Sequence, residues 1–243
     1  MASYGTHHFA EKVALVSDVG SPVGRAVSMQ LALLGSFVIG IDRESTDTAR
    51  RSIDELVNLG TLAKCISADP ATQEGCETAA EAVREMFGRL DLLVNCLKNE
   101  PESVFQDHTQ AGFIELVQAN LGSVHFLTNA VTGLMKDRPG PRIVNIAWSD
   151  NSDPTFAAVQ AGVIRFSETI ANWLPDNFRV NCVAVGSKWP ANFANDKGGR
   201  SECRRVEPDE VARAVLFLLS SESAGMNGQV LNLGHAGIGR RSE

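Results

Sequence analysis

The polar side chains whose spacing most suggests chemistry lie within residues 142–170. This stretch predicts a buried strand over 142–147, a polar loop, and a helix that begins near Phe156. The loop includes the hydroxyl of Ser149 and the carboxylates of Asp150 and Asp153. The two carboxylates could act as a pair in acid–base chemistry, although acids in a polar loop are mostly solvated or cap the following helix.

The histidines and cysteines predict no metal site. Three of the five histidines, His108, His125 and His235, are far apart in the sequence, and His7 and His8 lie near the N-terminus. The five cysteines form no C-x-x-C or C-x-x-H pattern. An odd number of cysteines without metal spacing is typical of a reducing compartment, so we expect a cytoplasmic protein.

The elements that position the loop alternate along the chain. Strands are expected over 12–18, 37–42, 62–69, 91–97, 142–147, 179–185 and 229–233, and helices over 25–34, 45–59, 72–88, 109–137, from 156, and over 208–220. Strands that alternate with helices of this length predict βαβ crossovers and a parallel sheet covered on both faces. We therefore expect an α/β fold, a single Rossmann-like doubly wound domain over residues 1–243 with a seven-stranded parallel sheet. Residues 1–11 are expected to be mobile, and 234–243 form a C-terminal tail.

Several segments, in order, carry a resemblance to the short-chain dehydrogenase/reductase (SDR) family. LVSDVGSPVGRAV resembles the family's LVTGxxxGIGRAI, DLLVNCLKN resembles DxLVNNAGx, and GQVLNLGHAG resembles the final GQxLxVDGG strand. VQANLGSVHFLT and FRVNCVAVG resemble two further family segments. Each match is weak alone, but together they cover residues 12 to about 237 at near-family spacing. The resemblance implies an NAD-dependent oxidoreductase ancestry.

The family's catalytic positions have lost their chemistry in this sequence. The resemblance places Trp148 at the serine, Phe156 at the tyrosine and Gln160 at the lysine of Tyr-x-x-x-Lys. The tyrosine is the family's general acid–base and the lysine lowers its pKa, whereas phenylalanine has no proton to give and glutamine no charge. Asn120 matches the family's proton-relay asparagine, and Ser149 is a possible substitute for the serine. We expect no hydride-transfer catalysis by this chain.

The nucleotide-binding turn is also degenerate. Asp18 and Pro22 stand at the first two family glycines, and only Gly24 remains. Pro22 removes an N–H donor. A carboxylate about 4 Å from a phosphate charge costs ~1 kcal/mol in water and ~4 kcal/mol at an effective dielectric constant of 20. Unless Asp18 points away and caps the helix, NAD binding should be weak or absent.

Three further positions belong to the family's cofactor site. Asp42 matches the acid that selects NAD, and Asp69 matches the aspartate near the adenine. Both are equally consistent with ordinary acids at strand ends. Asn95 survives from the family's NNAG, but Cys96, Leu97 and Lys98 replace the rest, and their bulk should crowd the cofactor's path.

Composition excludes other classes of partner. The net charge of −7 and the isoelectric point near 5.3 argue against nucleic acid, which requires clustered Lys and Arg. No run is long and apolar enough for a membrane span or a signal peptide.

Apolar side chains at helical spacing suggest surfaces for assembly. They lie on the helix from 156 and on the long helix before it, where the family forms a four-helix dimer interface: Val159, Val163, Phe166, Ile170, Phe113, Val117, Val124 and Leu127. The run VLFLL, at residues 215–219, is apolar on more sides than contact with one sheet would cover. It resembles the segment that forms a second interface in the family. The alternative is that these residues only face their own sheet.

These expectations favour a catalytically silent SDR-fold subunit. It would assemble, as a heterotetramer, with an active homologous SDR that binds NAD and oxidises a substrate of the hydroxyacyl-CoA type, and it would stabilise that partner or complete its pocket. The resemblance extends to the inactive chain of a heteromeric hydroxybenzylsuccinyl-CoA dehydrogenase. Two alternatives are a redox-independent lyase, isomerase or cyclase that uses Ser149, Asp150 or Asn120, and a sensor of a metabolite or nucleotide.

Overall fold

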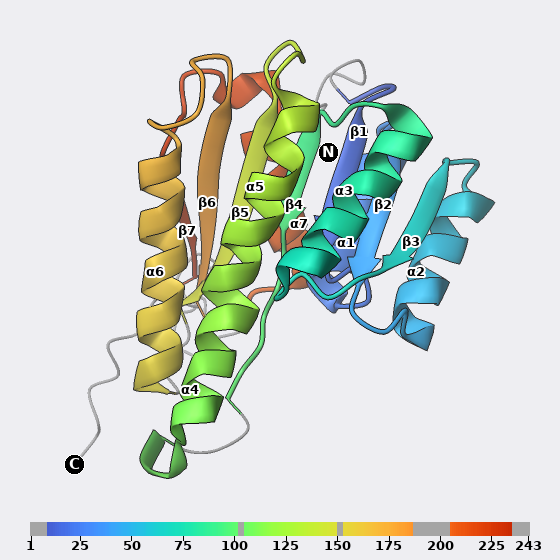
Figure 1. Cartoon of the computed structure of the whole chain (residues 1–243). Coiled ribbons are helices and arrows are strands. Elements are labelled where there is room, and N and C mark those ends of the chain that lie inside the picture. The colour runs from blue at the N-terminus through green and yellow to red at the C-terminus, as the bar shows by residue number, and fades with distance from the viewer. Residues whose placement is uncertain (1–8, 102–104, 150–152, 187–204, 235–243) are drawn as a thin grey trace, which may run out of the picture.

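The computed structural model describes residues 9–101, 105–149, 153–186 and 205–234. Its core is one parallel sheet of seven strands in the order β3-β2-β1-β4-β5-β6-β7 (Figure 1). The strands are β1 (Val13–Ser17), β2 (Phe37–Asp42), β3 (Ala63–Ser67), β4 (Leu92–Asn95), β5 (Arg142–Ser149), β6 (Arg179–Gly186) and β7 (Val230–Leu233). The predicted Rossmann-like fold is confirmed.

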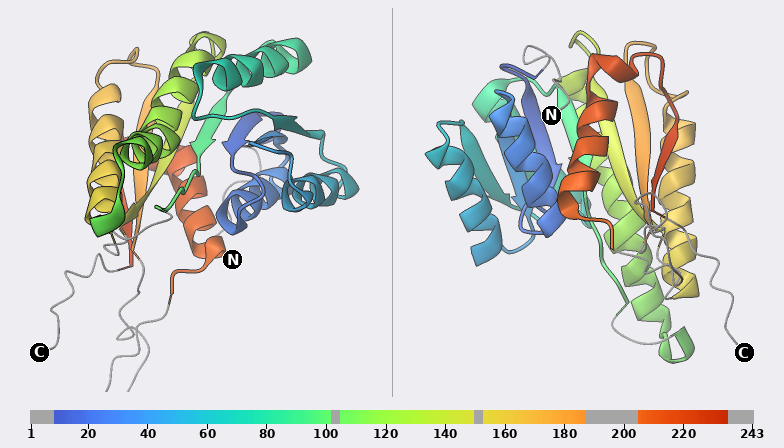
Figure 2. Two further views of the ribbon diagram at one scale, coloured as in Figure 1. Left: turned by 60° about the horizontal axis from the view of Figure 1, so that its bottom comes forward. Right: turned by 180° about the vertical axis from the view of Figure 1, so that it is seen from behind.

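Helices cover both faces of the sheet. One face carries α3 (Gln73–Phe87), α5 (Ser123–Met135) and α6 (Pro154–Ile170), and the other carries α1 (Pro22–Leu33), α2 (Asp47–Asn58) and α7 (Pro208–Leu219) (Figure 2). Each face has its own apolar core. The strands are therefore continuous apolar runs rather than alternating ones, and β1 is buried along its whole length.

The long helix predicted over 109–137 is interrupted by a π-helical turn. α4 (Gln110–Val117) leads into this turn, η2 (Gln118–Gly122), and then into α5. Thr109 caps the start of α4, where its hydroxyl accepts the N–H of Gly112 at 3.1 Å. A short 3-10 helix, η1 (Phe105–Asp107), precedes it. π-Turns are rare and often lie at functional sites, and this one contains Asn120.

Two helices begin earlier than expected, because proline occupies their first turn. α1 begins at Pro22, three residues before the predicted start, and α6 begins at Pro154, two residues before Phe156. Proline lacks the N–H that the first helical position leaves unpaired in any case. β5 also continues past the predicted end, to Ser149, where it pairs with Gly186 of β6. Ser149 thus lies in the strand rather than in the loop.

The N-terminal segment is partly fixed to the domain. Phe9 is fully buried, and the Glu11 N–H donates to the carbonyl of Gly35 at 2.9 Å. The expectation of mobility through residue 11 is therefore wrong for residues 9–11. Residues 1–8 lie outside the described residues. So do residues 235–243, which are all of the predicted C-terminal tail except Gly234.

The apolar run VLFLL of α7 has its partners within the chain. Val215, Leu216, Leu218 and Leu219 are buried, and only Phe217 is partly exposed. They form the core that α7 shares with the sheet and with α1. The apolar character of VLFLL therefore does not require a second interface.

Candidate functional site

The candidate site lies at the carboxyl ends of β1, β2, β4 and β5. In a doubly wound sheet, ligands bind where the strand order reverses, which here is between β1 and β4. Asp18 follows β1, and Asp42 and Asn95 end β2 and β4. A cavity of about 240 Å³ opens there, and Asp18, Asp42, Asp69 and Lys98 contribute to its lining.

The turn after β1 is built around a close backbone contact. Asp18 has a φ of 53°, in the left-handed region, which favours the glycine that the family has there. Gly24 is required by packing, since a Cβ on it would lie 2.1 Å from the Asp18 carbonyl oxygen. Ser21 caps α1, because its hydroxyl accepts the Gly24 N–H at 3.0 Å. Asp18 is thus not the cap of α1.

The Asp18 carboxyl group is electrostatically unfavourable where it lies. Burial, and then the nearby charge of Asp42, raise its pKa from 3.8 to about 6, against a lowering hydrogen bond with Ser21. A carboxylate in this position opposes a second negative charge in the cavity.

Asp42 and Asp69 are held by their own loops. The Asp42 carboxylate accepts the Thr46 N–H at 2.9 Å and the Glu44 N–H at 3.3 Å. Asp69 accepts the Ala71 N–H at 2.9 Å, and its other oxygen lies 3.3 Å from Nε of Arg43. Both carboxylates thus have partners in or next to their own loops.

Asn95 belongs to the core rather than to the cavity. It is fully buried, and its side-chain amide donates to Oδ1 of Asn145 at 2.7 Å. Lys98 instead lies over the site, with Nζ 4.9 Å from the ring centre of Trp148 and 2.5 Å from Oε1 of Glu100. Lys98 thus lies over the indole of Trp148, which the resemblance places at the family's serine.

The positions that the resemblance assigns to the family's catalytic residues form a closed hydrogen-bond network. Gln160 is buried; it donates from Nε2 to Oδ1 of Asn120 at 3.0 Å and accepts the backbone N–H of Trp148 at 3.0 Å. Asn120 also accepts the Asn99 N–H at 3.1 Å and donates to the carbonyls of Asn99 and Leu116, both at 2.9 Å. Gln160 thus bridges Trp148 and Asn120, and the four hydrogen bonds of the Asn120 side-chain amide are all made within the chain.

Phe156 and Asp153 lie at the start of α6, beside the polar loop that follows β5. Phe156 is fully buried in the first turn of α6, and its N–H donates to Oδ1 of Asp153 at 2.8 Å. Asp153 is therefore the cap of α6, the more ordinary of its two expected roles. Ser149 is partly exposed at the end of β5, and Asp150 lies outside the described residues.

The structure also pairs two residues that the sequence did not connect. Nε2 of His108, just before α4, lies 3.5 Å from Oδ2 of Asp153, just before α6. His108 lines a second cavity, of about 430 Å³, which shares Arg43, Asn99 and Ala119 with the first. The pair spans 45 positions in the sequence, and no local spacing would have revealed it.

The described residues contain neither a metal-binding cluster nor a membrane-spanning helix. No three His, Cys, Asp or Glu side chains within them come together as a potential metal site. None of the helices in that part of the chain is long and apolar enough to cross a membrane.

Comparisons with known proteins agree on one family. A family model described as enoyl-(acyl carrier protein) reductase matches residues 19–234. The chain is 30% identical to the 3-oxoacyl-(acyl-carrier-protein) reductase FabG of Vibrio cholerae, over 91% of this chain and 95% of that one. It is 28% identical to the (2S)-((R)-hydroxy(phenyl)methyl)succinyl-CoA dehydrogenase subunit BbsD of Thauera aromatica, over 90% and 94% of the two chains.

Solved structures agree with the sequence relatives. A short chain dehydrogenase from Mycobacterium smegmatis superposes with a TM-score of 0.80 at 25% identity, covering 96% of this chain and 94% of that one. A dehydrogenase/reductase from Sinorhizobium meliloti 1021 has the same fold, with a TM-score of 0.83 at 23% identity over 96% and 97% of the two chains. The chain belongs to the short-chain dehydrogenase/reductase family of oxidoreductases.

Proposed function

We propose that this chain is a subunit without hydride-transfer activity of its own, which assembles with a homologous, active SDR and stabilises it. The observation that carries the proposal is the closed network around Gln160. A proton donor and a neighbouring cation are what the family's tyrosine and lysine supply. Here Phe156 and Gln160 are both buried and uncharged. General acid–base catalysis typically contributes 10² to 10⁴ in rate, and this chain lacks the groups for it at those positions.

The residues of the cofactor site do not fit a dinucleotide. Pro22 at the first position of α1 cannot donate an N–H to a phosphate, and the Asp18 carboxyl lines the cavity that would receive one. Asp42 already accepts two N–H groups of its own loop. We therefore assign NAD to the partner, and we expect this chain to bind it weakly at most.

An apolar groove between the α4–α5 helix and α6 supports assembly. It encloses about 650 Å³, and Val117, Leu121, Phe126 and Phe166 contribute to its lining. Phe113, on the adjoining turn of α4, is 49% exposed. Large exposed apolar surfaces mark interaction sites. The surface is narrower than the sequence suggested, because four of the expected residues are buried within the chain: Val124, Leu127, Val159 and Val163.

The relatives support the kind of partner. BbsD is itself named as a subunit of a CoA-thioester dehydrogenase, and it aligns with 90% of this chain. A family member of that kind is thus a model for the active partner, with a hydroxyacyl-CoA as its substrate class. The redox-independent alternative has less support, since the Asn120 amide is committed to four hydrogen bonds and Asp153 caps α6.

Native mass spectrometry of the protein isolated from its own cells tests the proposal. We expect a complex that contains this chain and a second SDR chain bearing Tyr-x-x-x-Lys in equal amounts. Phe166→Glu should dissociate that complex because it places a charge in the groove. Leu62→Glu is the matched control, since Leu62 is an exposed apolar residue beside β3, at the far edge of the sheet. A homo-oligomer without a second chain, or a partner fully active and equally stable alone, would contradict the proposal.

A further inference from the structure

The apolar groove between the α4–α5 helix and α6 contains a titratable ring. His125, an exposed residue of α5, is among the residues that line the groove. Its ring lies edge-on to two aromatic side chains of the same groove, with ring centres 5.3 Å apart for Phe126 and 5.8 Å apart for Phe166. α5 and α6 lie side by side on one face of the sheet (Figure 1). The imidazole is therefore part of the wall of the groove.

The charged and titratable groups around His125 come from the two neighbouring helices. On α6, Arg165 also lines the groove; it pairs with Glu168 at 3.0 Å and its side chain is 78% exposed. On α3, Cys76 and Glu77 line a smaller cavity of about 270 Å³ that His125 borders on its other side. Burial raises the pKa of the Cys76 thiol to about 12, so this group stays neutral. α5 itself has no other titratable side chain.

None of these groups neutralises a proton on His125. The Glu77 carboxylate is exposed and already accepts a hydrogen bond from Nε2 of Gln73 at 2.8 Å. Within the described residues, the ion pair of a histidine belongs to His108 and not to His125. Arg165 is itself a cation and opposes a second positive charge in the groove.

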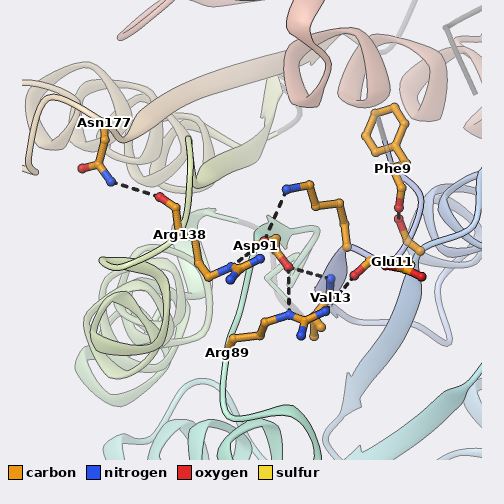
Figure 3. A network of polar contacts seen from close by, with 9 residues as sticks. Phe9, Glu11, Val13, Arg89, Asp91, Arg138 and Asn177 are labelled. Carbon is orange, nitrogen blue, oxygen red and sulfur yellow. Dashed lines mark hydrogen bonds and ion pairs between the residues drawn. The ribbon is translucent and has the colours of Figure 1, made fainter. Parts of the chain in front are cut away.

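Charges that this chain removes from water have partners within it. The buried carboxylate of Asp91 lies 2.8 Å from Nε of Arg138 and 3.7 Å from Nε of Arg89 (Figure 3). The partly buried Arg179 donates from its terminal nitrogens to backbone carbonyls at the end of α7 and in the turn beyond it, at 2.7 to 3.1 Å: those of Leu218, Ser220, Ser223 and Met226. A charge enclosed without such partners is strongly unfavourable.

A partner that covers the groove affects its two basic residues differently. Arg165 has a long side chain, so its tip can stay in water beside Glu168 while its stem is covered. The imidazole of His125 is attached through a single methylene group and lies against two phenyl rings. An apolar helix laid in the groove would therefore enclose the ring. Such an enclosure suits the neutral imidazole and disfavours the imidazolium.

We propose that His125 makes assembly through this groove dependent on pH, because the complex forms with the neutral imidazole against an uncharged, apolar surface of the partner. The inference rests on the proposed function, since it concerns the same groove. Where histidine titrates, the free chain binds a proton that the complex excludes, so the complex weakens as the pH falls. One excluded proton raises the Kd about tenfold between pH 8 and pH 5.5.

Sedimentation velocity of the complex isolated from its own cells tests the inference, in a dilution series at constant ionic strength and at pH 8, 7, 6 and 5.5. We expect the Kd of the wild-type complex to rise about tenfold over this range. His125→Phe keeps an aromatic ring but takes up no proton, so its complex should have the same Kd at every pH. His125→Gln is a second uncharged variant with the same expectation. His108→Gln is the matched control, since His108 pairs with Asp153 outside the groove, and it should retain the wild-type rise.

The comparison with His125→Phe also separates His125 from Asp18, whose pKa of about 6 lies in the same range. A Kd that is the same at every pH, or that responds equally with and without His125, would overturn the inference and leave the proposed function standing. A complex that tightens as the pH falls would mean that the partner sets a carboxylate against His125, which overturns it too. A chain recovered alone at every pH would contradict the proposed function itself and the inference with it.

Discussion

Replacing Asp18 by asparagine should stabilise this protein at neutral pH. The Asp18 carboxyl has a pKa of about 6 against an ordinary value of 3.8, mainly because of burial and then because of Asp42. At about 1.4 kcal/mol per pKa unit, that shift corresponds to about 3 kcal/mol of destabilisation when the group is ionised. Because Asp18 is partly exposed and the turn can relax, we expect a gain of about 1 to 3 kcal/mol from Asp18→Asn. Asparagine also tolerates the φ of 53° at this position.

The sign of the effect depends on pH. Between about pH 4 and pH 6 the folded chain binds more protons at Asp18 than the unfolded chain does, so the free energy of unfolding falls as the pH rises through this window. Asp18→Asn removes this dependence. The two proteins should be similar in stability near pH 4 and should differ fully at pH 7.5. For a chain of 243 residues the gain corresponds to a rise in Tm of about 3 to 9 °C.

Urea unfolding followed by circular dichroism at several pH values from 4 to 7.5 would measure this difference. Asp18→Ala is the control, since it removes the charge but keeps a Cβ at positive φ, and it should recover about 1 kcal/mol less. A variant that is equally stable at every pH would refute the reasoning about charge. A variant less stable than the wild type at pH 7.5 would show that the carboxylate makes a favourable contact instead.

Two further substitutions test the interior. Gln160→Met keeps the volume but leaves the Trp148 N–H without its acceptor, while the Asn120 oxygen keeps only the Asn99 N–H, so it should cost about 1 to 3 kcal/mol in urea unfolding; a loss below about 0.5 kcal/mol would contradict the closed network. Arg179→Met removes the donors that close α7 and should cost about 3 to 5 kcal/mol, with Arg179→Lys intermediate. Equal stability of the methionine and lysine variants would mean that the carbonyl contacts contribute nothing.

The fold was predictable because its signals are local. Each strand is a short apolar run, and each crossover is a segment of helical period, so the element order follows from the pattern alone. The errors at the helix starts are also local. Ser21 before Pro22 and Asp153 before Pro154 are capping pairs that can be read from the sequence, and weighting them would have placed both helix starts correctly.

The site was only partly predictable. The resemblance predicts which family residues are replaced, but not what the residues at those positions contact. The place of Lys98 over Trp148 and the pairing of His108 with Asp153 each join segments that are distant in the chain. The misreading of VLFLL has the same origin, since the burial of α7 between the sheet and α1 is a property of packing that hydropathy does not contain.

The retention of Asn120 does not imply a working proton relay. Its side-chain amide bonds to the backbone of Asn99 and of Leu116, and this fixes the loop after β4 against the π-turn between α4 and α5. That role needs only an amide, with no proton transfer, and Gln160 completes it by occupying the remaining acceptor position. A lysine at 160 would supply a charge with no tyrosine beside it to activate. The glutamine instead satisfies two buried groups without burying a charge, so the interior is stable with phenylalanine at 156 and glutamine at 160.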